Sequence, residues 1–446
     1  MKRLITFVII LSVIGLMQAS GHTLVPGEKE IGFTGHLNKR CMPLRGGTVY
    51  LHLIVKTPDI RIKERKPMNL SVVLDRSGSM ADERKIDYAK AAINSLIDQL
   101  SSEDYLSIVI YDQSVDVLVP RQRVKNKSRL KSFVNQVEPR GSTNLGGGMV
   151  EGFNQLEERV DREYINRVIL LSDGLANQGI TDPSELSRIA SRYRTKSISL
   201  TTMGVGLDYN ENMMLGLAES GGGSYYYIES PSQLASIFEQ ELHGLSTMVC
   251  QNAVIELSLG KGVELVDVIG YERHKERSAW LIPLGDLYSN DERELTLELN
   301  VTGGSGSKHV ASAELQYDKR ISELRNQPRL SVDIRLTDIT AELEKGTDWD
   351  VQGKVDVALS TRKVEQAMQS LDAGNEAEAA VAIEEARSMI QSSGAITNSA
   401  AAKPMMQEQM QRLETFSKEL KDESKDTRAK KKSIQYRNYQ VQKKKD

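Results

Sequence analysis

The sequence predicts an α/β fold with a doubly wound, mostly parallel sheet, inserted in or followed by an antiparallel β-sandwich and then by a C-terminal helical region. Between residues 67 and 245, apolar strand segments alternate with segments of helical spacing. Between 246 and 338 the segments become short and alternating, with turns between them, and from Asp350 the apolar period is helical. Alternating strands and helices imply a parallel sheet covered on both faces, whereas consecutive short strands imply a sandwich.

The predicted α/β domain covers residues 67–245 and begins at Pro67. Its apolar, β-branched strand segments read as strands that are buried on both faces. The expected strands lie at 70–74, 105–111, 115–119, 168–171, 197–205 and 225–228. The expected helices lie at 86–100, 127–137, 145–159, 183–194, 210–220 and 232–243.

The predicted sandwich covers residues 246–338. Its expected strands lie at 254–259, 263–269, 278–284, 294–302, 309–317 and 329–336. Residues 48–56 also alternate, but no strand partner precedes them in the sequence, because we expect loops over 22–45. We therefore expect the strand or strands of residues 46–66 to join the sandwich, which makes the α/β domain an insertion between sandwich strands.

Two further segments complete the domain plan. Residues 339–425 form the helical region, and its first two helices resemble one hairpin of a tetratricopeptide repeat. The basic tail over 426–446 contains Lys430–Lys432 and Lys443–Lys445 and has no amphipathic pattern, so we expect it to be disordered. The alternative role for the tail is weak contact with an anionic membrane surface or an acidic partner.

The first 21 residues have the pattern of a signal peptide: Lys2 and Arg3, an apolar run over 4–17, and small residues at 19–21. The alternative is an uncleaved membrane anchor. We expect export to a bacterial periplasm or cell envelope, or beyond it. The net charge of −3 gives no overall attraction to nucleic acid. An exported chain with two cysteines permits one disulfide, Cys41–Cys250, and the alternative is two buried free thiols.

Oxygen-bearing side chains follow the strand segments of the α/β domain. Asp75, Ser77 and Ser79 come directly after the strand at 70–74, and Asp173 follows the strand at 168–171. Thr143 lies in a glycine-rich loop over 141–148. Ligands of open α/β sheets bind at the carboxyl ends of the strands, and carboxylate and hydroxyl oxygens suit a hard divalent cation.

The order Asp-x-Ser-x-Ser, then Thr, then Asp resembles the metal-ion-dependent adhesion site of von Willebrand factor type A domains. Residues 202–211 also resemble the fifth strand and following loop of these domains, and the insertion in a sandwich resembles integrin β-chains. The resemblance implies a Mg²⁺ site, in which Mn²⁺ can substitute, with five metal-site residues: Asp75, Ser77, Ser79, Thr143 and Asp173. It further implies a protein–protein interaction or adhesion module that docks a partner's Asp or Glu on the ion.

Three rival functions remain. The first is an envelope-complex scaffold that binds through its C-terminal helices and keeps a structural metal. The second is a metal-dependent hydrolase, for which Asp82 or Glu83 would be the nearest general base. We interpret both residues instead as acidic side chains in the first turn of a helix, where negative charge is favourable. The sequence has no His-Glu-x-x-His, phosphate-binding loop or nucleophile elbow, and its histidines are scattered, so we expect no enzyme and no catalytic residues. The third is service to a chelatase-type ATPase, which the export signal disfavours.

Overall fold

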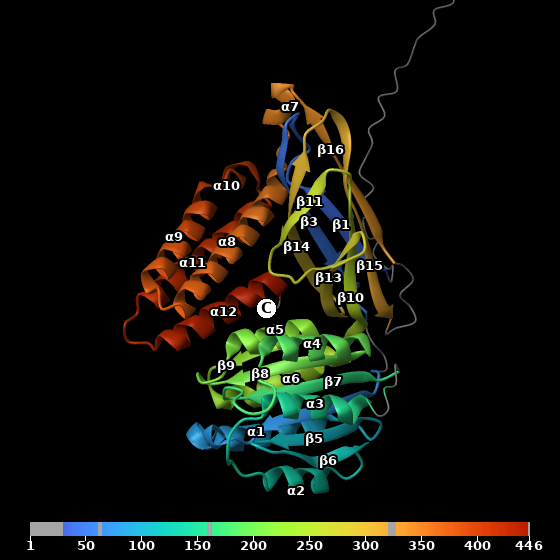
Figure 1. The fold of residues 1–446 in the computed structure, drawn as a ribbon, viewed down its shortest axis with the longest axis vertical. Helices are drawn as coiled ribbons and strands as arrows, with labels where there is room; N and C mark the ends of the chain where they lie inside the picture. The colour runs from blue at the N-terminus through green and yellow to red at the C-terminus, as the bar shows by residue number, and fades with distance from the viewer. Residues whose placement is uncertain (1–29, 61–64, 158–159, 161–162, 320–326, 445–446) are drawn as a thin grey trace, which may run out of the picture.

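The computed structural model describes residues 30–60, 65–157, 160, 163–319 and 327–444. The α/β domain occupies one end of the molecule, and the sandwich occupies the other, with the helical region along its side (Figure 1). The C-terminal helix, over residues 427–443, lies between the α/β domain and the other helices of the helical region. The proposed signal peptide over 1–21 is outside the described residues. Within the described ranges, no helix has both the length and the apolar character that a membrane crossing requires.

The α/β domain is built on a six-stranded sheet with the order β6-β5-β4-β7-β8-β9. All neighbours pair in parallel except β5 and β6. Every residue of β4 and β7 is buried, which explains their continuous apolar runs. The strands are β4 Met68–Asp75, β5 Tyr105–Tyr111, β6 Val115–Arg123, β7 Ile165–Ser172, β8 Ile198–Val205 and β9 Gly222–Ile228.

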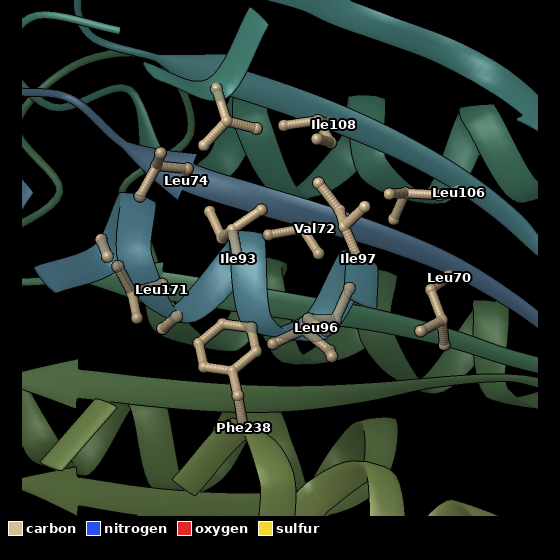
Figure 2. Packing of buried hydrophobic residues seen from close by; sticks show 14 of the residues in the cluster. Leu70, Val72, Leu74, Ile93, Leu96, Ile97, Leu106, Ile108, Leu171 and Phe238 are labelled. Atoms are coloured by element: carbon tan, nitrogen blue, oxygen red, sulfur yellow. The ribbon is translucent and has the colours of Figure 1, made fainter. Parts of the chain in front are cut away.

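Helices cover both faces of this sheet, as the predicted doubly wound fold requires. Figure 2 shows one face, where Leu70, Val72 and Leu74 of β4 pack against Ile93 and Leu96 of α1. Helices α1, α2 and α6 contribute to this face, and α3, α4 and α5 to the other. The helices are α1 Lys85–Gln99, α2 Lys127–Asn135, α3 Leu145–Glu157, α4 Pro183–Thr195, α5 Glu211–Gly221 and α6 Leu234–Ser246.

The sandwich consists of two sheets with the orders β1-β3-β14-β11 and β12-β13-β10-β15-β16-β2. Strand β3, which precedes the α/β domain, pairs along its whole length with β14, which follows it. The α/β domain is thus inserted between β3 and β10, and the predicted fold class is confirmed. The strands are β1 Gly32–Leu37, β2 Cys41–Pro43, β3 Gly46–Lys56, β10 Met248–Leu259, β11 Val263–Val268, β12 His274–Glu276, β13 Ala279–Tyr288, β14 Glu292–Thr302, β15 Gly306–Lys319 and β16 Arg329–Thr337.

The prediction of loops over 22–45 is wrong for β1 and β2. Both strands are at or near sheet edges, and β1 (Gly32–Leu37) contains two glycines and a histidine. A strand of this composition has no strong periodic pattern, and it depends on backbone hydrogen bonds to β3 for its conformation. Single-sequence patterns do not report such a partner.

The helical region packs around its own apolar core, which includes Val364, Ile383, Met406 and Phe416. Helices α8 and α9 form the expected hairpin (Figure 1). Asp348 caps α8, because its carboxylate accepts a hydrogen bond from the amide of Val351. The helices are α7 Thr340–Glu344, α8 Trp349–Asp372, α9 Glu376–Ser392, α10 Ala395–Asn398, α11 Ala402–Leu420 and α12 Thr427–Lys443.

The prediction of a disordered basic tail is wrong, because residues 427–443 form helix α12. Its three consecutive lysines, Lys430–Lys432, are buried rather than solvated. Lys431 Nζ lies 2.5 Å from Glu211 Oε1, and Lys432 Nζ donates to the carbonyl oxygen of Tyr209 over 2.7 Å. The acceptors that stabilise these charges belong to the α/β domain, so the tail sequence alone did not reveal them.

The predicted disulfide is also wrong, because Cys41 and Cys250 are both buried free thiols. Cys41 pairs opposite Arg335, which in turn pairs with Ser307 near the start of β15. Cys250 pairs opposite Lys319, at the end of β15. At roughly 3.3 Å per residue, the length of β15 separates the two thiols by about 40 Å. They lie at opposite ends of the sandwich, and the two-thiol alternative holds.

Candidate metal centre at the carboxyl edge of the sheet

Asp75 is the last residue of β4, and its carboxylate is fully buried. Its Oδ1 accepts a hydrogen bond from the amide of Ser77 over 2.8 Å, which turns the chain immediately after the strand. Its Oδ2 accepts a hydrogen bond from the hydroxyl of Ser172 over 2.7 Å. Both oxygens are therefore fixed, one by the following loop and one by the neighbouring strand β7.

The loop after β4 brings its two serines to one point. The Oγ atoms of Ser77 and Ser79 lie 3.2 Å apart, and Ser79 Oγ donates to Asp173 Oδ1 over 2.8 Å. Asp173 follows β7 in the sequence, so this hydrogen bond joins the carboxyl ends of two adjacent parallel strands. Four of the five predicted residues are thus linked directly by hydrogen bonds.

Thr143 reaches the same point from a third loop. A methyl group built on Gly174 would lie 3.4 Å from Thr143 Oγ1 and 3.6 Å from Ser79 Oγ. Two hydrogen bonds to Asn177 hold the backbone of Thr143. The backbone N–H of Thr143 donates to Asn177 Oδ1 over 2.9 Å, and the backbone N–H of Asn177 donates to the carbonyl oxygen of Thr143 over 3.1 Å. The structure therefore brings together all five residues that the sequence predicted.

The donor set fits a hard divalent cation. It consists of two carboxylates and three hydroxyls, which are oxygen ligands of the kind that Mg²⁺ and Mn²⁺ prefer. Burial raises the pKa of Asp75 to about 6, and burial also raises the pKa of Asp173. Two desolvated carboxylates are unfavourable as neighbouring ions, and a cation between them would relieve that repulsion. Among the described residues, no group of three or more His, Cys, Asp or Glu side chains is placed to hold a metal ion, and the candidate site differs in that it combines two carboxylates with three hydroxyls.

Sequence reasoning missed Lys85, which is part of the site. Its Nζ lies 2.8 Å from Asp173 Oδ2, and its side chain is 5% exposed. Lys85 is the first residue of α1, where a lysine usually points into solvent. A signal was present, since Lys85 lies on the same helical stripe as the buried residues Ala89, Ala92 and Leu96.

The sequence also did not predict a clamp formed by Arg76, Asp112 and Arg140, which joins two of the three site loops, those of Ser77 and Thr143. Asp112 Oδ2 lies 2.9 Å from Arg76 Nε and 2.7 Å from Arg140 Nε. Burial opposes ionisation of Asp112, but the hydrogen bonds from Arg140 and Ser114 and the charge of Arg76 outweigh it and lower its pKa to about 2. The amide of Arg140 also donates to the carbonyl oxygen of Arg76 over 2.7 Å.

The sequence predicted Asp82 and Glu83 in the first turn of a helix, but neither residue lies in α1. They are exposed and lie in the 3₁₀ segment Gly78–Arg84, before the helix starts. Glu83 and Arg84 have φ angles of +51° and +58°, a conformation that non-glycine residues seldom adopt. This segment is strained next to the candidate site, where such strain commonly gathers.

An open, mostly parallel sheet with oxygen-bearing side chains gathered at its carboxyl edge is typical of the class of α/β domains that bind ligands at that edge. A family profile described as the von Willebrand factor type A domain matches residues 69–240. This part of the chain is a von Willebrand factor type A domain, which is a protein–protein interaction or adhesion module.

Relatives of this chain occur in bacteria and animals. It is 26% identical over 289 residues to the uncharacterized protein YfbK of Escherichia coli, covering 64% of this chain and 50% of that one. It is 28% identical over 335 residues to the uncharacterized protein sll0103 of Synechocystis sp., covering 72% and 78%. It is 27% identical over 208 residues to human inter-alpha-trypsin inhibitor heavy chain H3, covering 43% of this chain and 23% of that one. The match thus spans half of the first relative and less than a quarter of the heavy chain.

Two solved structures share the fold over nearly the whole chain. The von Willebrand factor type A protein from Catenulispora acidiphila has a TM-score of 0.71 at 16% identity, and covers 93% of this chain and 98% of its own. The ArnB paralog VWA2 from Sulfolobus acidocaldarius has a TM-score of 0.61 at 18% identity, with coverages of 92% and 98%. At these identities the likeness concerns the fold alone.

Proposed function

We propose that the protein is an exported bacterial interaction module that binds a partner protein through a divalent cation. Asp75, Ser77, Ser79, Thr143 and Asp173 would hold the ion, Mg²⁺ or in its place Mn²⁺, and the partner would contribute an Asp or Glu carboxylate. The hydrogen bond between Ser79 and Asp173 carries this proposal, because it joins the loops after β4 and β7 at the point where the other predicted residues gather.

The ion would supply a positive charge to which a carboxylate binds. The chain's own residues prepare the place for it. Asp75 is held by Ser77 and Ser172, so its carboxylate needs no reordering when a cation arrives. Only two carboxylates are present, which leaves the donor set less negative than a calcium cage and favours a further anionic ligand.

The surface beside the site is suited to a partner. The five predicted residues are mostly buried, while Gly78 and Leu175 at the rim are exposed. Leu175 is 56% exposed and offers an apolar contact to a partner docked beside the site. The signal-peptide pattern over residues 1–21 supports an envelope or extracellular location.

The scaffold alternative has its own supporting observation on α9. Val381 is 57% exposed and lies beside Ala380 and Met389 on the outer face of this helix. In the scaffold model a partner covers this face and the metal centre is structural. Val381→Glu would then abolish partner binding, and Asp75→Ala would leave it intact.

The proposed function is tested by affinity purification of partners from bacterial envelope extracts, using the full chain with Mg²⁺ or with EDTA. We expect capture that requires Mg²⁺ and that Asp75→Ala abolishes while the protein keeps its fold by circular dichroism. Asp82→Ala is the matched control, because it removes an exposed carboxylate next to the site. Capture that survives both EDTA and Asp75→Ala would refute the proposal.

A further inference from the structure

We infer that Lys85 sets the charge of the metal centre, so that the cation and the partner's carboxylate bind cooperatively. This inference rests on the proposed function and deepens it. Lys85 acts through its charge and through Asp173, and it is therefore a positioning residue. Its variants change metal affinity in a direction that a purely structural role would not produce.

The ammonium group of Lys85 is fixed inside the site. Its Nζ lies 2.8 Å from Asp173 Oδ2, and the side chains of Lys85 and Asp173 are 5% and 0% exposed. A methyl group built on Gly206 would lie 3.4 Å from Lys85 Cε and 3.6 Å from Nζ. The chain at Gly206 therefore passes directly over the end of the lysine and keeps the ammonium group from swinging into solvent.

The charge of Lys85 changes the balance of the site. Asp75 and Asp173 together contribute two negative charges, and Lys85 neutralises one of them. Of the neighbouring charged groups, Arg76 pairs with Asp112 and Asp116, Asp208 pairs with Arg428, and Asp82 and Glu83 are exposed to solvent. The centre thus carries a net charge of −1 without an ion and +1 with a divalent cation.

A net positive centre in a buried environment binds an anion more strongly than a neutral one does, because charges in a low-dielectric interior interact strongly. The same fixed ammonium repels the incoming cation and weakens its binding when no carboxylate is present. Each ligand therefore raises the affinity of the other, and this coupling is reciprocal by thermodynamic necessity. Without Lys85 the two aspartates would balance the dication by themselves, and this coupling would be lost.

The test is a calorimetric titration of the full chain with Mg²⁺, in buffers of equal ionic strength with and without acetate as the carboxylate probe. For the wild type we expect acetate to increase the affinity for Mg²⁺. Lys85→Met should bind Mg²⁺ alone about tenfold tighter, and acetate should no longer increase that affinity. Lys90→Met, on the same helix at a lysine that pairs with the exposed Glu138, should behave as the wild type.

A second readout is the melting temperature. Lys85→Met leaves Asp173 buried without its counter-ion, so the metal-free variant should melt below the wild type, and Mg²⁺ should raise its melting temperature more. Lys85→Gln keeps a hydrogen-bond donor but removes the charge, and should shift Mg²⁺ affinity in the same direction if Lys85→Met does not fold.

The outcomes separate this inference from the proposed function. If the wild type binds Mg²⁺, Asp75→Ala does not, and folded Lys85 variants bind it no tighter than the wild type, the inference about Lys85 is overturned and the metal centre stands. If Mg²⁺ binds neither the wild type nor the Lys85 variants, both fall.

Discussion

Lys432 places its Nζ 3.9 Å from the centre of the Tyr209 ring and 2.7 Å from the Tyr209 carbonyl oxygen, although the two residues are 223 positions apart. This contact joins the C-terminal helix α12 to the loop after β8. The same helix donates from Asn438 to Thr361 of α8, and from Lys443 to Gly270 of the sandwich. The helix at the C-terminal end thus connects the α/β domain, the helical region and the sandwich (Figure 1).

Replacement of Lys432 should destabilise the whole protein. Lys432 also forms a buried ion pair with Glu211, and Lys432→Met would remove one of the two lysines that neutralise this carboxylate. We expect a loss of about 3 kcal/mol in the free energy of unfolding, measured by denaturant titration. Lys425→Met, at a half-exposed position before the helix, should change it by less than about 0.5 kcal/mol. Equal stability of the two variants would contradict this role of α12.

Asp112→Asn should loosen the metal centre without touching its five predicted residues. The variant removes the negative charge that holds Arg76 and Arg140, and hence the loops on either side of the site. We expect weaker Mg²⁺ binding in calorimetry and a lower melting temperature. Glu138→Gln, an exposed carboxylate near the same loop, is the control and should have little effect. Unchanged Mg²⁺ affinity in Asp112→Asn would show that the clamp is not needed.

The effect of Asp112→Asn should depend on pH. The pKa of Asp112 in the folded protein is about 2, below its ordinary value of 3.8. The stability that its ionised form contributes is fully present above about pH 4 and is lost as the pH falls towards 2. The difference in unfolding free energy between wild type and variant should therefore be constant from pH 7 to 5 and shrink below pH 4. A difference that grows on acidification would have the wrong sign.

Arg167→Met should weaken the joint between the α/β domain and the sandwich. Arg167 of β7 is fully buried, and its Nη2 lies 2.6 Å from Asp286 Oδ2 of β13. Its Nη1 lies 3.7 Å from Glu241 Oε1, so the variant would leave two buried carboxylates without their guanidinium. We expect a loss of about 3–5 kcal/mol by denaturant unfolding. Arg188→Met, whose side chain is 74% exposed, should be nearly neutral.

The cysteines should behave as thiols even after oxidative purification. Cys41 and Cys250 lie at opposite ends of the sandwich, so they cannot form an intramolecular bridge without rearrangement of the fold. Thiol titration in denaturant should find both groups free, and a reducing agent should not change the melting temperature. A faster-migrating band on a non-reducing gel, lost on reduction, would indicate the bridge that the structure lacks.

The architecture was largely predictable because its main elements have strong local patterns. The continuous apolar runs of β4 and β7 come from burial on both faces, and the alternation in β3 comes from one buried face. The five predicted metal-site residues could be found for a related reason. Four of them follow a strand and Thr143 lies in a glycine-rich loop, and parallel strands place their carboxyl ends at one edge of the sheet.

What the sequence did not predict depends on partners far along the chain. The lysines of α12 are buried because carboxyl and carbonyl oxygens of the α/β domain receive them, and no pattern within the tail encodes that. Lys85 and Asp112 were missed for the same reason, since their roles arise from contacts with Asp173, Arg76 and Arg140. The thiols were mispaired because the distance along β15 was not visible in the cysteine spacing.

If side chains from three separate loops form one divalent-cation site, a Mn²⁺ titration followed by electron paramagnetic resonance will detect the bound ion. We expect the wild type to bind a single Mn²⁺ per chain, and Mg²⁺ to displace it. The Ser77→Ala/Ser79→Ala double variant and Thr143→Ala should each lose this binding while remaining folded. Equal Mn²⁺ binding by the wild type and these folded variants would contradict this expectation.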